Sequence, residues 1–375
     1  MSLQKASPLA DVAANMSERN NRPVWRLLDT GTRRAAENMA LNRALLTGRQ
    51  QNVSPDTIRF LAFEPSALLG YHQSAEQELN LDRCRELGVA VQRRITGGGA
   101  IYMDQGQLGW ELYLDRKAAC AAEMSVVARR ICEAAACGLQ QLGVAAAYRP
   151  RNDIEVNGRK ISGTGGAFDG DALMYQGTLL MDFDVERMLT VLNIPAGKLS
   201  DKAIASARER VTSLAALLPD LPSRQHIIDV LATAMTEAFG VAAEPGELNP
   251  AEQSLYEQAL AEIDSPDWID MVQRPVHDRP VRSAEHKFPA GLLRVNVAWD
   301  RQQARIRQVW FSGDVFVSPA RTLIDLESHL RDTLAEKMPE AIRTFFDGRQ
   351  VDMLGLQPED IAGLLSQALQ QEETA

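Results

Sequence analysis

Two stretches of the chain carry residue types suited to binding an anion. In the first, Arg93–Ala100, two arginines and a threonine flank three adjacent glycines, Gly97, Gly98 and Gly99. Glycines leave backbone N–H groups unobstructed, and a nearby arginine adds positive charge, so the stretch suits a phosphate or a carboxylate. A tight turn that needs positive φ at several positions is the alternative interpretation, and we favour the ligand-binding one.

The second stretch, Asn152–Gly163, predicts a β-hairpin, because Asn157-Gly158 lies between alternating apolar and polar residues. The expected cross-strand pairs are Val156 with Arg159, Glu155 with Lys160, Ile154 with Ile161, and Asp153 with Ser162. This places Lys160 on a rigid element, as needed to hold a cation against a reacting group. Taken alone, an exposed ion pair with Glu155 explains Lys160 better.

Neither glycine cluster fits a known phosphate-binding fingerprint. The chain has no GxxxxGK[ST] pattern, and the second cluster, Gly163–Gly166, lacks the third glycine of a dinucleotide-binding loop because Phe168 occupies that position. The sequence therefore argues against a P-loop protein and against a Rossmann dinucleotide-binding protein.

The overall charge narrows the possible partners. The chain has 40 basic and 50 acidic residues, a net charge of −10. This balance argues against a general nucleic-acid binder and gives no attraction to anionic membranes. An anionic ligand must therefore meet a local basic patch. The basic residues that would join the first stretch in such a patch, if the fold brings them together, are Arg149, Arg151, Arg159 and Lys160.

The cysteines and histidines predict neither a zinc site nor a disulfide framework. The four cysteines lack CxxC spacing and have no histidine nearby in sequence, and the five histidines contain no HExxH pair. No apolar run reaches the length that spans a bilayer, and the N-terminal residues lack the pattern of a signal peptide. We therefore expect a cytoplasmic protein.

The elements around the two stretches predict two folded units. A chain of 375 residues is long for a single core, and the segment from Ser265 to Pro289 is rich in proline and charge, as linkers are. We expect a flexible leader over residues 1–21, a large domain over 22–264, a linker over 265–290 and a small α+β domain over 291–375.

Together these motifs resemble the lipoate-protein ligase A family, within the biotin and lipoate ligase superfamily. The resemblance covers most of the chain and rests on Arg93–Ala100, Asn152–Ile154 and Lys160–Gly163. Supporting stretches are Glu37–Ala40, Gly177–Leu180 and Ala205–Leu214. The segment around Trp268 and the strand pair ending at Gly313-Asp314 resemble the small C-terminal accessory domain of that family.

The resemblance implies a fold and a reaction. The large domain would be a mixed, largely antiparallel sheet flanked by helices, related to the catalytic domains of class II synthetases. Lipoate or octanoate and Mg-ATP would give an acyl-AMP and pyrophosphate, and a lysine of a lipoyl-domain acceptor protein would then take the acyl group. The acceptor would be a 2-oxoacid dehydrogenase E2, a glycine-cleavage H-type protein or a similar carrier.

The same resemblance assigns roles to individual residues. Lys160 and Arg94 are implied to be catalytic, since a carboxylate that attacks the α-phosphate needs the charge on both anions neutralised. Asp153 is implied to bind Mg²⁺. The residues implied to contact the lipoyl-adenylate are Gly97, Gly98, Gly99, Ala100, Asn152, Ser162, Gly163 and Gly177.

Two departures from the family pattern keep other interpretations open. Met103 and Gln176 stand where family ligases usually carry histidines. The changes point either to a specialised ligase with an unusual acceptor or to a protein without activity. A non-catalytic module that binds lipoate or escorts a carrier protein therefore remains an alternative, although such a module would not need Lys160.

The nearest enzymatic alternative is an octanoyl- or lipoyltransferase of the same fold, which passes the acyl chain through a cysteine thioester. The family cysteine would fall near Leu173 or in the loop before Asn152, and neither place has one. A biotin ligase is disfavoured because such enzymes typically carry a GRGRxGR-like loop where this chain has Arg93–Gly99. We expect the ligase.

Overall fold

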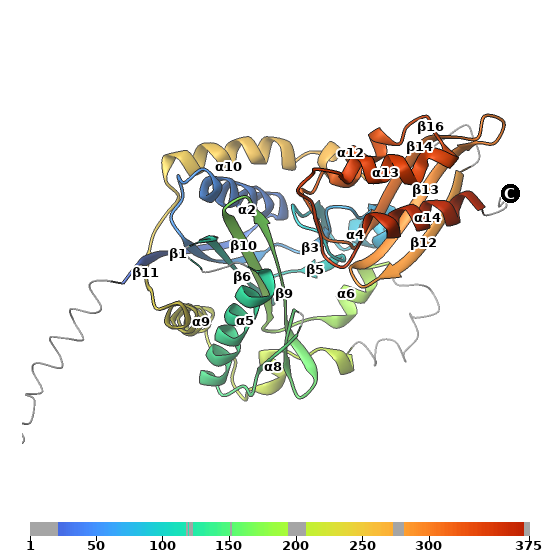
Figure 1. Ribbon diagram of the computed structural model, residues 1–375. Coiled ribbons are helices and arrows are strands. Elements are labelled where there is room, and N and C mark those ends of the chain that lie inside the picture. Colours follow the sequence, from blue (N-terminus) through green and yellow to red (C-terminus); the bar gives the residue numbers. More distant parts are fainter. Residues whose placement is uncertain are drawn as a thin grey trace, which may run out of the picture.

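The computed structural model of the chain describes residues 22–117, 119, 123–150, 152–193, 208–272 and 281–370. The leader expected over residues 1–21 lies outside this range. The largest sheet has eight strands: β1 (Val24–Arg33), β2 (Thr57–Phe63), β6 (Gln107–Asp115), β7 (Ala147–Arg149), β8 (Asp153–Val156), β9 (Arg159–Asp169), β10 (Ala172–Leu180) and β11 (Ala242–Pro245). Their order is β11-β1-β2-β6-β10-β9-β8-β7 (Figure 1). Only the pairs of β1 with β2 and β11 are parallel among these strands, so the expected mixed, largely antiparallel sheet is confirmed.

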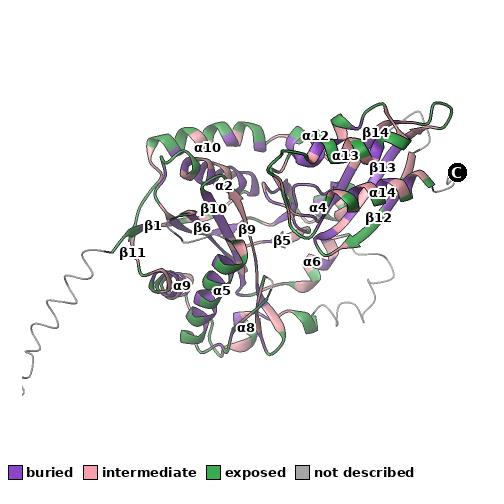
Figure 2. Cartoon of the chain, in the orientation of Figure 1, coloured by how far each residue is buried: buried purple, intermediate pink, exposed green. Residues whose placement is uncertain are grey.

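Helices cover both faces of this sheet (Figure 1). On one face lie α2 (Ala35–Gln50) and α10 (Pro250–Ile263), and on the other lie α5 (Met124–Gln141), α8 (Leu214–Leu217) and α9 (Arg224–Phe239). The apolar residues that recur at helical spacing along α5 are buried against the sheet, as the 3.6-residue period requires. The buried residues follow the strands and the inner sides of the helices (Figure 2).

A second, smaller sheet carries the glycine loop. It has the order β4-β3-β5 and consists of β3 (Ser66–Leu69), β4 (Ala90–Arg93) and β5 (Ile101–Met103). The short helices beside it are α3 (Ala75–Glu78), α4 (Leu81–Glu86) and α6 (Val185–Val191). Because β4 ends at Arg93 and β5 begins at Ile101, the loop between them is anchored at both ends by strands that pair with β3.

The C-terminal part of the chain has its own sheet and core. The order β12-β13-β14-β16 joins β12 (Val281–Phe288), β13 (Gly291–Asp300), β14 (Arg305–Gly313) and β16 (Thr333–Leu334). Around it lie β15 (Val317–Ser318), α12 (Thr322–His329), η2 (Ala335–Lys337), α13 (Met338–Phe346), β17 (Asp352–Met353) and α14 (Pro358–Gln370). The short helix α11 (Pro266–Ile269) instead contacts β4 of the sheet that carries the glycine loop. Residues 281–288, which the sequence placed in the linker, pair with β13 along their whole length.

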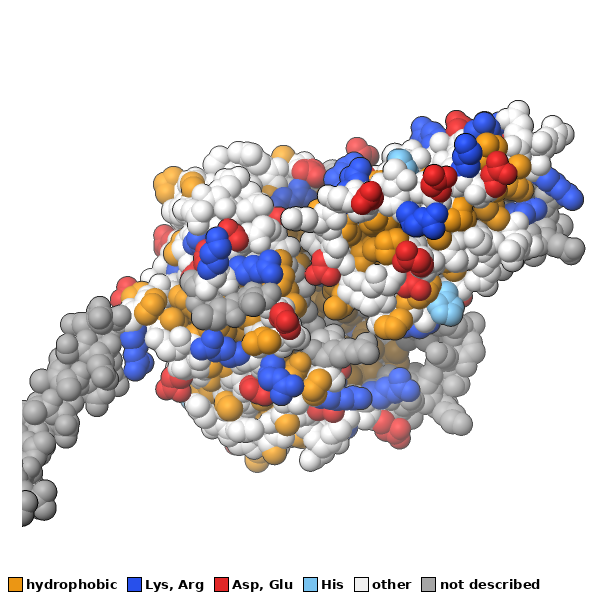
Figure 3. Space-filling model, in the orientation of Figure 1, with side chains coloured by type: hydrophobic (Ala, Val, Ile, Leu, Met, Phe, Trp, Pro, Cys, Tyr) orange, Lys and Arg blue, Asp and Glu red, His pale blue; other side chains and the backbone are white. Residues whose placement is uncertain are grey.

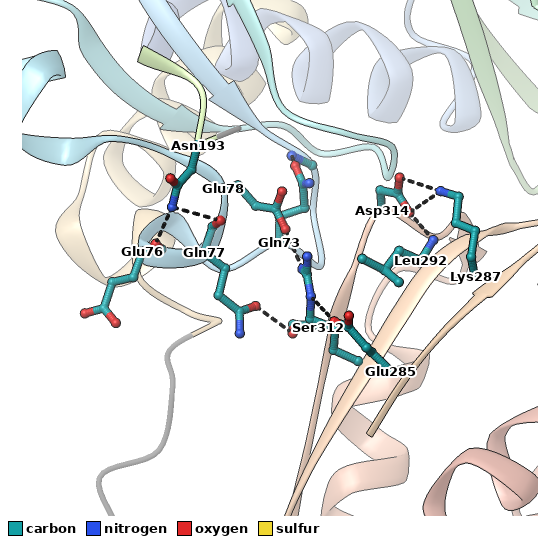
Figure 4. Close-up of polar contacts among 12 residues, drawn as sticks. Gln73, Glu76, Gln77, Glu78, Asn193, Glu285, Lys287, Leu292, Ser312 and Asp314 are labelled. Atoms are coloured by element: carbon teal, nitrogen blue, oxygen red, sulfur yellow. Dashed lines mark hydrogen bonds and ion pairs between the residues drawn. The ribbon is translucent and has the colours of Figure 1, made fainter. Parts of the chain in front are cut away.

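Polar contacts join the C-terminal sheet to the α3 segment of the large unit (Figure 4). Arg294 on β13 donates to Glu78 Oε1 at 2.6 Å, and Ser312 Oγ on β14 donates to Gln77 Oε1 at 3.1 Å. The backbone N–H of Gly313 donates to the carbonyl of His72 at 3.0 Å. Hydrogen bonds and an ion pair therefore join the two units.

Candidate active site

A cavity of about 400 Å³ lies between the glycine loop and the large sheet. Its volume is that of a small-molecule binding site. One part of the lining is apolar and comes from α2, β2, β3, β5, β10 and the α6 region: Met39, Leu61, Phe63, Leu68, Ile101, Met103, Leu180, Phe183, Met188 and Leu192. Of the residues expected at the site, those that line the cavity are Arg94, Gly97, Gly98, Gly99, Ala100, Asn152, Lys160, Gly163 and Gly177.

The guanidinium of Arg94 organises the glycine loop. Arg94 is 7% exposed. It donates to the carbonyl of Leu68 at 3.0 Å, to that of Gly97 at 3.0 Å and to that of Gly99 at 2.9 Å. Burial and the neighbouring charge of Arg93 lower the pKa of Arg94 to about 10. The side chain stays charged at neutral pH, and two loop carbonyls and one carbonyl of β3 take up part of its donor capacity.

Arg93 serves the surrounding scaffold. Its side chain is fully buried and donates to the carbonyls of Gly70, Tyr71 and Gln73, at 2.6 to 3.0 Å. It also donates to the carbonyl of Ile269 at 2.6 Å, and Trp268 Nε1 donates back to the carbonyl of Arg93 at 3.1 Å. Arg93 therefore ties the loop entrance to α11.

The expected hairpin is present, but its register differs from the expected one. Val156 pairs with Arg159 and Glu155 with Lys160, as predicted. A bulge at Ile161 then pairs Ile154 with Ser162 and Asp153 with Gly163, so the two outer pairs were wrong. Ile161 and Ser162 are both buried, at 0% and 1% exposure. A bulge adds one residue to one strand and redirects the side chains after it.

The bulge decides which residues meet Lys160. Gly163 now faces the same side as Lys160, and a Cβ at Gly163 would lie 2.7 Å from Lys160 Nζ. The Lys160 ammonium forms an ion pair with Asp153 Oδ1 at 2.7 Å, whereas Glu155 pairs with Arg149. The carbonyl of Lys160 accepts from the N–H of Thr212 at 2.9 Å, which fixes the backbone. The ion pair between Lys160 and Glu155 suggested from the sequence was therefore wrong, although the two residues are opposite each other in the strand register.

Asn152 is positioned by a buried hydroxyl network. Its carbonyl accepts from Thr164 N at 2.8 Å and from Thr164 Oγ1 at 3.0 Å. Thr164 Oγ1 lies 2.8 Å from the Tyr175 hydroxyl, and Cys132 Sγ lies 3.3 Å from the same hydroxyl. Burial raises the pKa of the Cys132 thiol, so it is a poor nucleophile at neutral pH.

Two expected site residues do not line the cavity. Ser162 points to the core side of β9, and its Oγ has no hydrogen-bond partner among the described residues. Asp153 forms an ion pair with Lys160, which does line the cavity. Gly177 does line the cavity, but a Cβ there would overlap the ring of Trp110, so this glycine also makes room for a core aromatic.

Both positions where family ligases usually carry histidine face the cavity. Met103 on β5 is 2% exposed. Gln176 on β10 donates from Nε2 to Thr96 Oγ1 at 3.3 Å, which links the large sheet to the start of the glycine loop. The two changes therefore alter the ligand-facing surface.

Sequence reasoning missed several residues of the lining. Phe316, from the loop between β14 and β15, reaches the cavity from the C-terminal unit, and its ring would lie 2.9 Å from a Cβ at Gly98. No local pattern distinguishes this phenylalanine. Gln107, Gly109 and Glu111 also line the cavity, and their alternate spacing along β6 was a usable signal for one face of a strand.

The drawn face of the molecule carries charged side chains of both signs (Figure 3). On the face drawn in Figure 3, lysine and arginine side chains are interspersed with aspartate and glutamate.

Among the described residues, no group of three or more His, Cys, Asp or Glu side chains could hold a metal ion. No described helix is both long and apolar enough to cross a membrane.

The fold places a partly apolar cavity beside the glycine loop and Lys160. Residues 34–236 match the lipoyl protein ligase A/B catalytic domain, which is more than half of the chain, and the chain belongs to this family. It is an enzyme of the lipoate ligase and octanoyltransferase type. The resemblance drawn from the motifs is confirmed.

Relatives carry both activities in their names. The octanoyltransferase LipM of Kyrpidia tusciae is 27% identical over 268 residues, which are 65% of this chain and 98% of that protein. The lipoate-protein ligase LplJ of Bacillus subtilis is 32% identical over 161 residues, 43% of this chain and 47% of that protein.

Solved structures extend the similarity of fold. The bipartite lipoate protein ligase of Thermoplasma acidophilum, described with its E2 lipoyl domain, has a TM-score of 0.60 at 25% identity and covers 68% of this chain and 100% of its own. A lipoate-protein ligase A bound with ATP has a TM-score of 0.57 at 24% identity, covering 65% and 98%. Plasmodium falciparum LipL1 in complex with lipoate has a TM-score of 0.69 at 16% identity, covering 92% and 99%.

Proposed function

We propose that this chain is an ATP-dependent lipoate-protein ligase. The observation that carries the proposal is the placement of Lys160, which lies over Gly163 and faces the glycine loop across the cavity. The lipoate carboxylate would attack the α-phosphate of ATP and release pyrophosphate. The lysine amine of a lipoyl-domain acceptor would then attack the acyl carbon, with AMP leaving.

The residues of this chain would stabilise charge in both steps. Lys160 would turn from Asp153 toward the phosphate as negative charge accumulates there, and the backbone N–H groups of Gly97 to Gly99 would face the same anion. Arg94 would hold the loop carbonyls that fix those N–H groups. Asn152 and Gly163 would contact the adenylate.

Mg²⁺ fits the residues present in one respect. The ion keeps several waters and usually takes one or two protein carboxylates together with substrate phosphates. Asp153, 25% exposed in its side chain and next to Lys160, meets this modest requirement. When bound, the ion would supply positive charge to the phosphates.

An octanoyltransferase is the second candidate, and the octanoyltransferase name of the relative from Kyrpidia tusciae favours it. That chemistry needs a thiol at the acyl carbon. None of the described cysteines lines the cavity. Cys132 contacts Thr164, which does line it, but burial raises the pKa of the Cys132 thiol. A non-catalytic lipoate-binding module is the third candidate, suggested by Met103 and Gln176.

One assay separates the three. Purified protein is given lipoate and Mg-ATP, or octanoyl carrier thioester without ATP, each with a lipoyl domain as acceptor. Lipoate-dependent pyrophosphate release followed by acylation of the domain is expected. Transfer from the thioester without ATP would overturn the ligase in favour of the transferase. Lipoate binding with neither activity would favour the module. The proposal includes a cytoplasmic location, where ATP and acceptor proteins meet.

A further inference from the structure

Two rows of residues cross the sheet beneath the cavity. Directly opposite residues of antiparallel strands place their side chains on the same face. The first row is nearly bare and consists of Leu61, Gly109, Thr178 and Gly163; the second consists of Arg59, Glu111, Gln176 and Gly165. The second row lies farther from the Lys160 ammonium, which lies over Gly163; Gly165 is two residues further along β9, or about 7 Å for a strand rise of ~3.3 Å per residue. The cavity thus runs from a lysine over glycines to a charged row.

The charged row contains a buried ion pair. Glu111 lines the cavity yet is only 4% exposed, and Arg59 behind it is fully buried. Arg59 Nη1 donates to Glu111 Oε2 at 3.0 Å. Two further donors reach the carboxylate, Asn42 Nδ2 at 2.6 Å and the Tyr113 hydroxyl at 2.7 Å. The carboxylate is therefore held from three sides.

The arginine of the pair is held as firmly. Its Nε donates to Thr30 Oγ1 at 3.1 Å and its Nη2 donates to Asn38 Oδ1 at 2.5 Å. Leucine and methionine side chains, such as Met39 and Leu61 in the cavity lining, can change rotamer to admit a longer ligand. A buried ion pair cannot be displaced at comparable cost, since separating it leaves charges without partners.

We propose that the Arg59–Glu111 pair ends the acyl channel and sets the longest alkyl chain that the cavity accepts. The inference rests on the proposed function in one respect, that the cavity holds an acyl chain. Each methylene placed over the apolar lining gains free energy by leaving water. A methylene placed against Glu111 covers the carboxylate and offers no hydrogen bond in return, which removes that gain.

The test is a series of straight-chain acids. Binding of hexanoate, octanoate, decanoate and dodecanoate is measured by calorimetry on the full chain, for the wild type and for Arg59→Met/Glu111→Leu. In the wild type, affinity is expected to rise roughly fourfold per methylene and then to stop rising within the series. In the double variant the rise is expected to continue to dodecanoate, because a buried pair is replaced by apolar side chains of similar volume.

A matched control removes a different buried ion pair. Arg26 and Glu252 pair at 2.5 Å with side chains 8% and 0% exposed, and neither lines the cavity. Arg26→Met/Glu252→Leu is expected to keep the wild-type break in the series. The same break in both double variants would overturn the inference.

The acid series on the wild-type protein can also overturn the inference by itself. A smooth rise through dodecanoate in the wild type would overturn the inference even if the Arg59→Met/Glu111→Leu protein did not fold. Failure of the proposed function is a separate outcome. No pyrophosphate release with normal acid binding would overturn the ligase and leave the length limit standing, whereas no acid binding at all would overturn both.

Discussion

The glycine loop and the hairpin face each other across one cavity, but they hold their cations in opposite ways. Arg94 is 7% exposed and gives hydrogen bonds to three carbonyls of the loop region. The Lys160 side chain is 40% exposed and has Asp153 as its ion-pair partner. A cation bound to its own loop fixes shape, whereas a half-exposed lysine can turn to a ligand. Under the proposed function, the loop would be preorganised by Arg94 and the Lys160 ammonium of the hairpin would act on the ligand.

The largest effect is expected when the hairpin cation is removed. Lys160→Met should lower lipoate-dependent pyrophosphate release at least 100-fold, the typical effect of deleting one preorganised donor to a charged transition state. The melting temperature should change little, because a half-exposed ion pair contributes less than about 1 kcal/mol. Turnover and thermal unfolding are measured on the same preparation.

A matched control for Lys160 lies within the C-terminal unit. Lys287→Met removes another lysine–aspartate pair, with Asp314 at 3.1 Å, and should leave pyrophosphate release unchanged. If Lys160→Met kept most of its turnover, the assignment of the chemistry to the hairpin would be lost.

Removal of the loop cation should act mainly on stability. Arg94→Met leaves the carbonyls of Leu68, Gly97 and Gly99 without their donor, at a cost of about 1–3 kcal/mol for each group that stays buried. A drop in melting temperature of roughly 5–10 °C is expected. Arg34→Met, which removes an exposed pair with Asp264, is the control and should melt like the wild type. An Arg94→Met protein with wild-type stability and no turnover would instead mean that Arg94 acts on the ligand.

Much of this site could be predicted from the sequence, because the glycine loop and the hairpin are local patterns. Three glycines after two arginines, and Asn-Gly between alternating residues, encode their own backbone geometry. The cavity then placed Arg94, Asn152 and Lys160 on one lining. The mixed, largely antiparallel character of the large sheet followed from the resemblance, whose ordered motifs span most of the chain.

The features of the site that could not be predicted from the sequence depend on long-range packing. The bulge at Ile161 was missed, because the turn at Asn157-Gly158 fixes only the first two pairs and burial of Ile161 and Ser162 decides the rest. Phe316 enters the cavity from a different sheet, and nothing near it in sequence marks that role. Nor did composition show that residues 281–288, part of the charged segment expected as a linker, form the edge strand β12.

Two neighbouring glycines sharpen the comparison within the loop itself. Gly98 has φ +93°, and a Cβ there would lie 2.9 Å from the ring of Phe316 and 3.3 Å from Arg94 Nη2. Gly98→Ala should therefore strain the loop and lower the melting temperature by about 2–5 °C. Gly99 has no described atom within 4 Å of the added Cβ, so Gly99→Ala should keep wild-type stability and change only ligand affinity. Equal melting temperatures for the two variants would contradict the account of the loop as a fixed element.

The smallest effect concerns the contact between the two units. His72 and Glu327 line a cavity of about 40 Å³ there, and His72 Nε2 has no hydrogen-bond partner among the described residues. Burial raises the pKa of Glu327 from 4.5 to about 7, although the N–H of Phe311 donates to it at 2.7 Å. Burial and the charge of Arg93 lower the pKa of His72 from 6.5 to about 4.

These two shifts give opposite pH dependences. The folded state favours protonated Glu327, so the stability it contributes is complete below pH 4.5 and is lost as the pH rises to about 7. Glu327→Gln should therefore gain roughly 2–5 °C in melting temperature relative to the wild type between pH 5 and pH 8. His72 contributes stability above pH 6.5 that is lost as the pH falls toward 4, so His72→Gln should gain on the wild type in the acid direction instead. If the two variants tracked the wild type at every pH, neither group would be held away from its ordinary pKa by this contact.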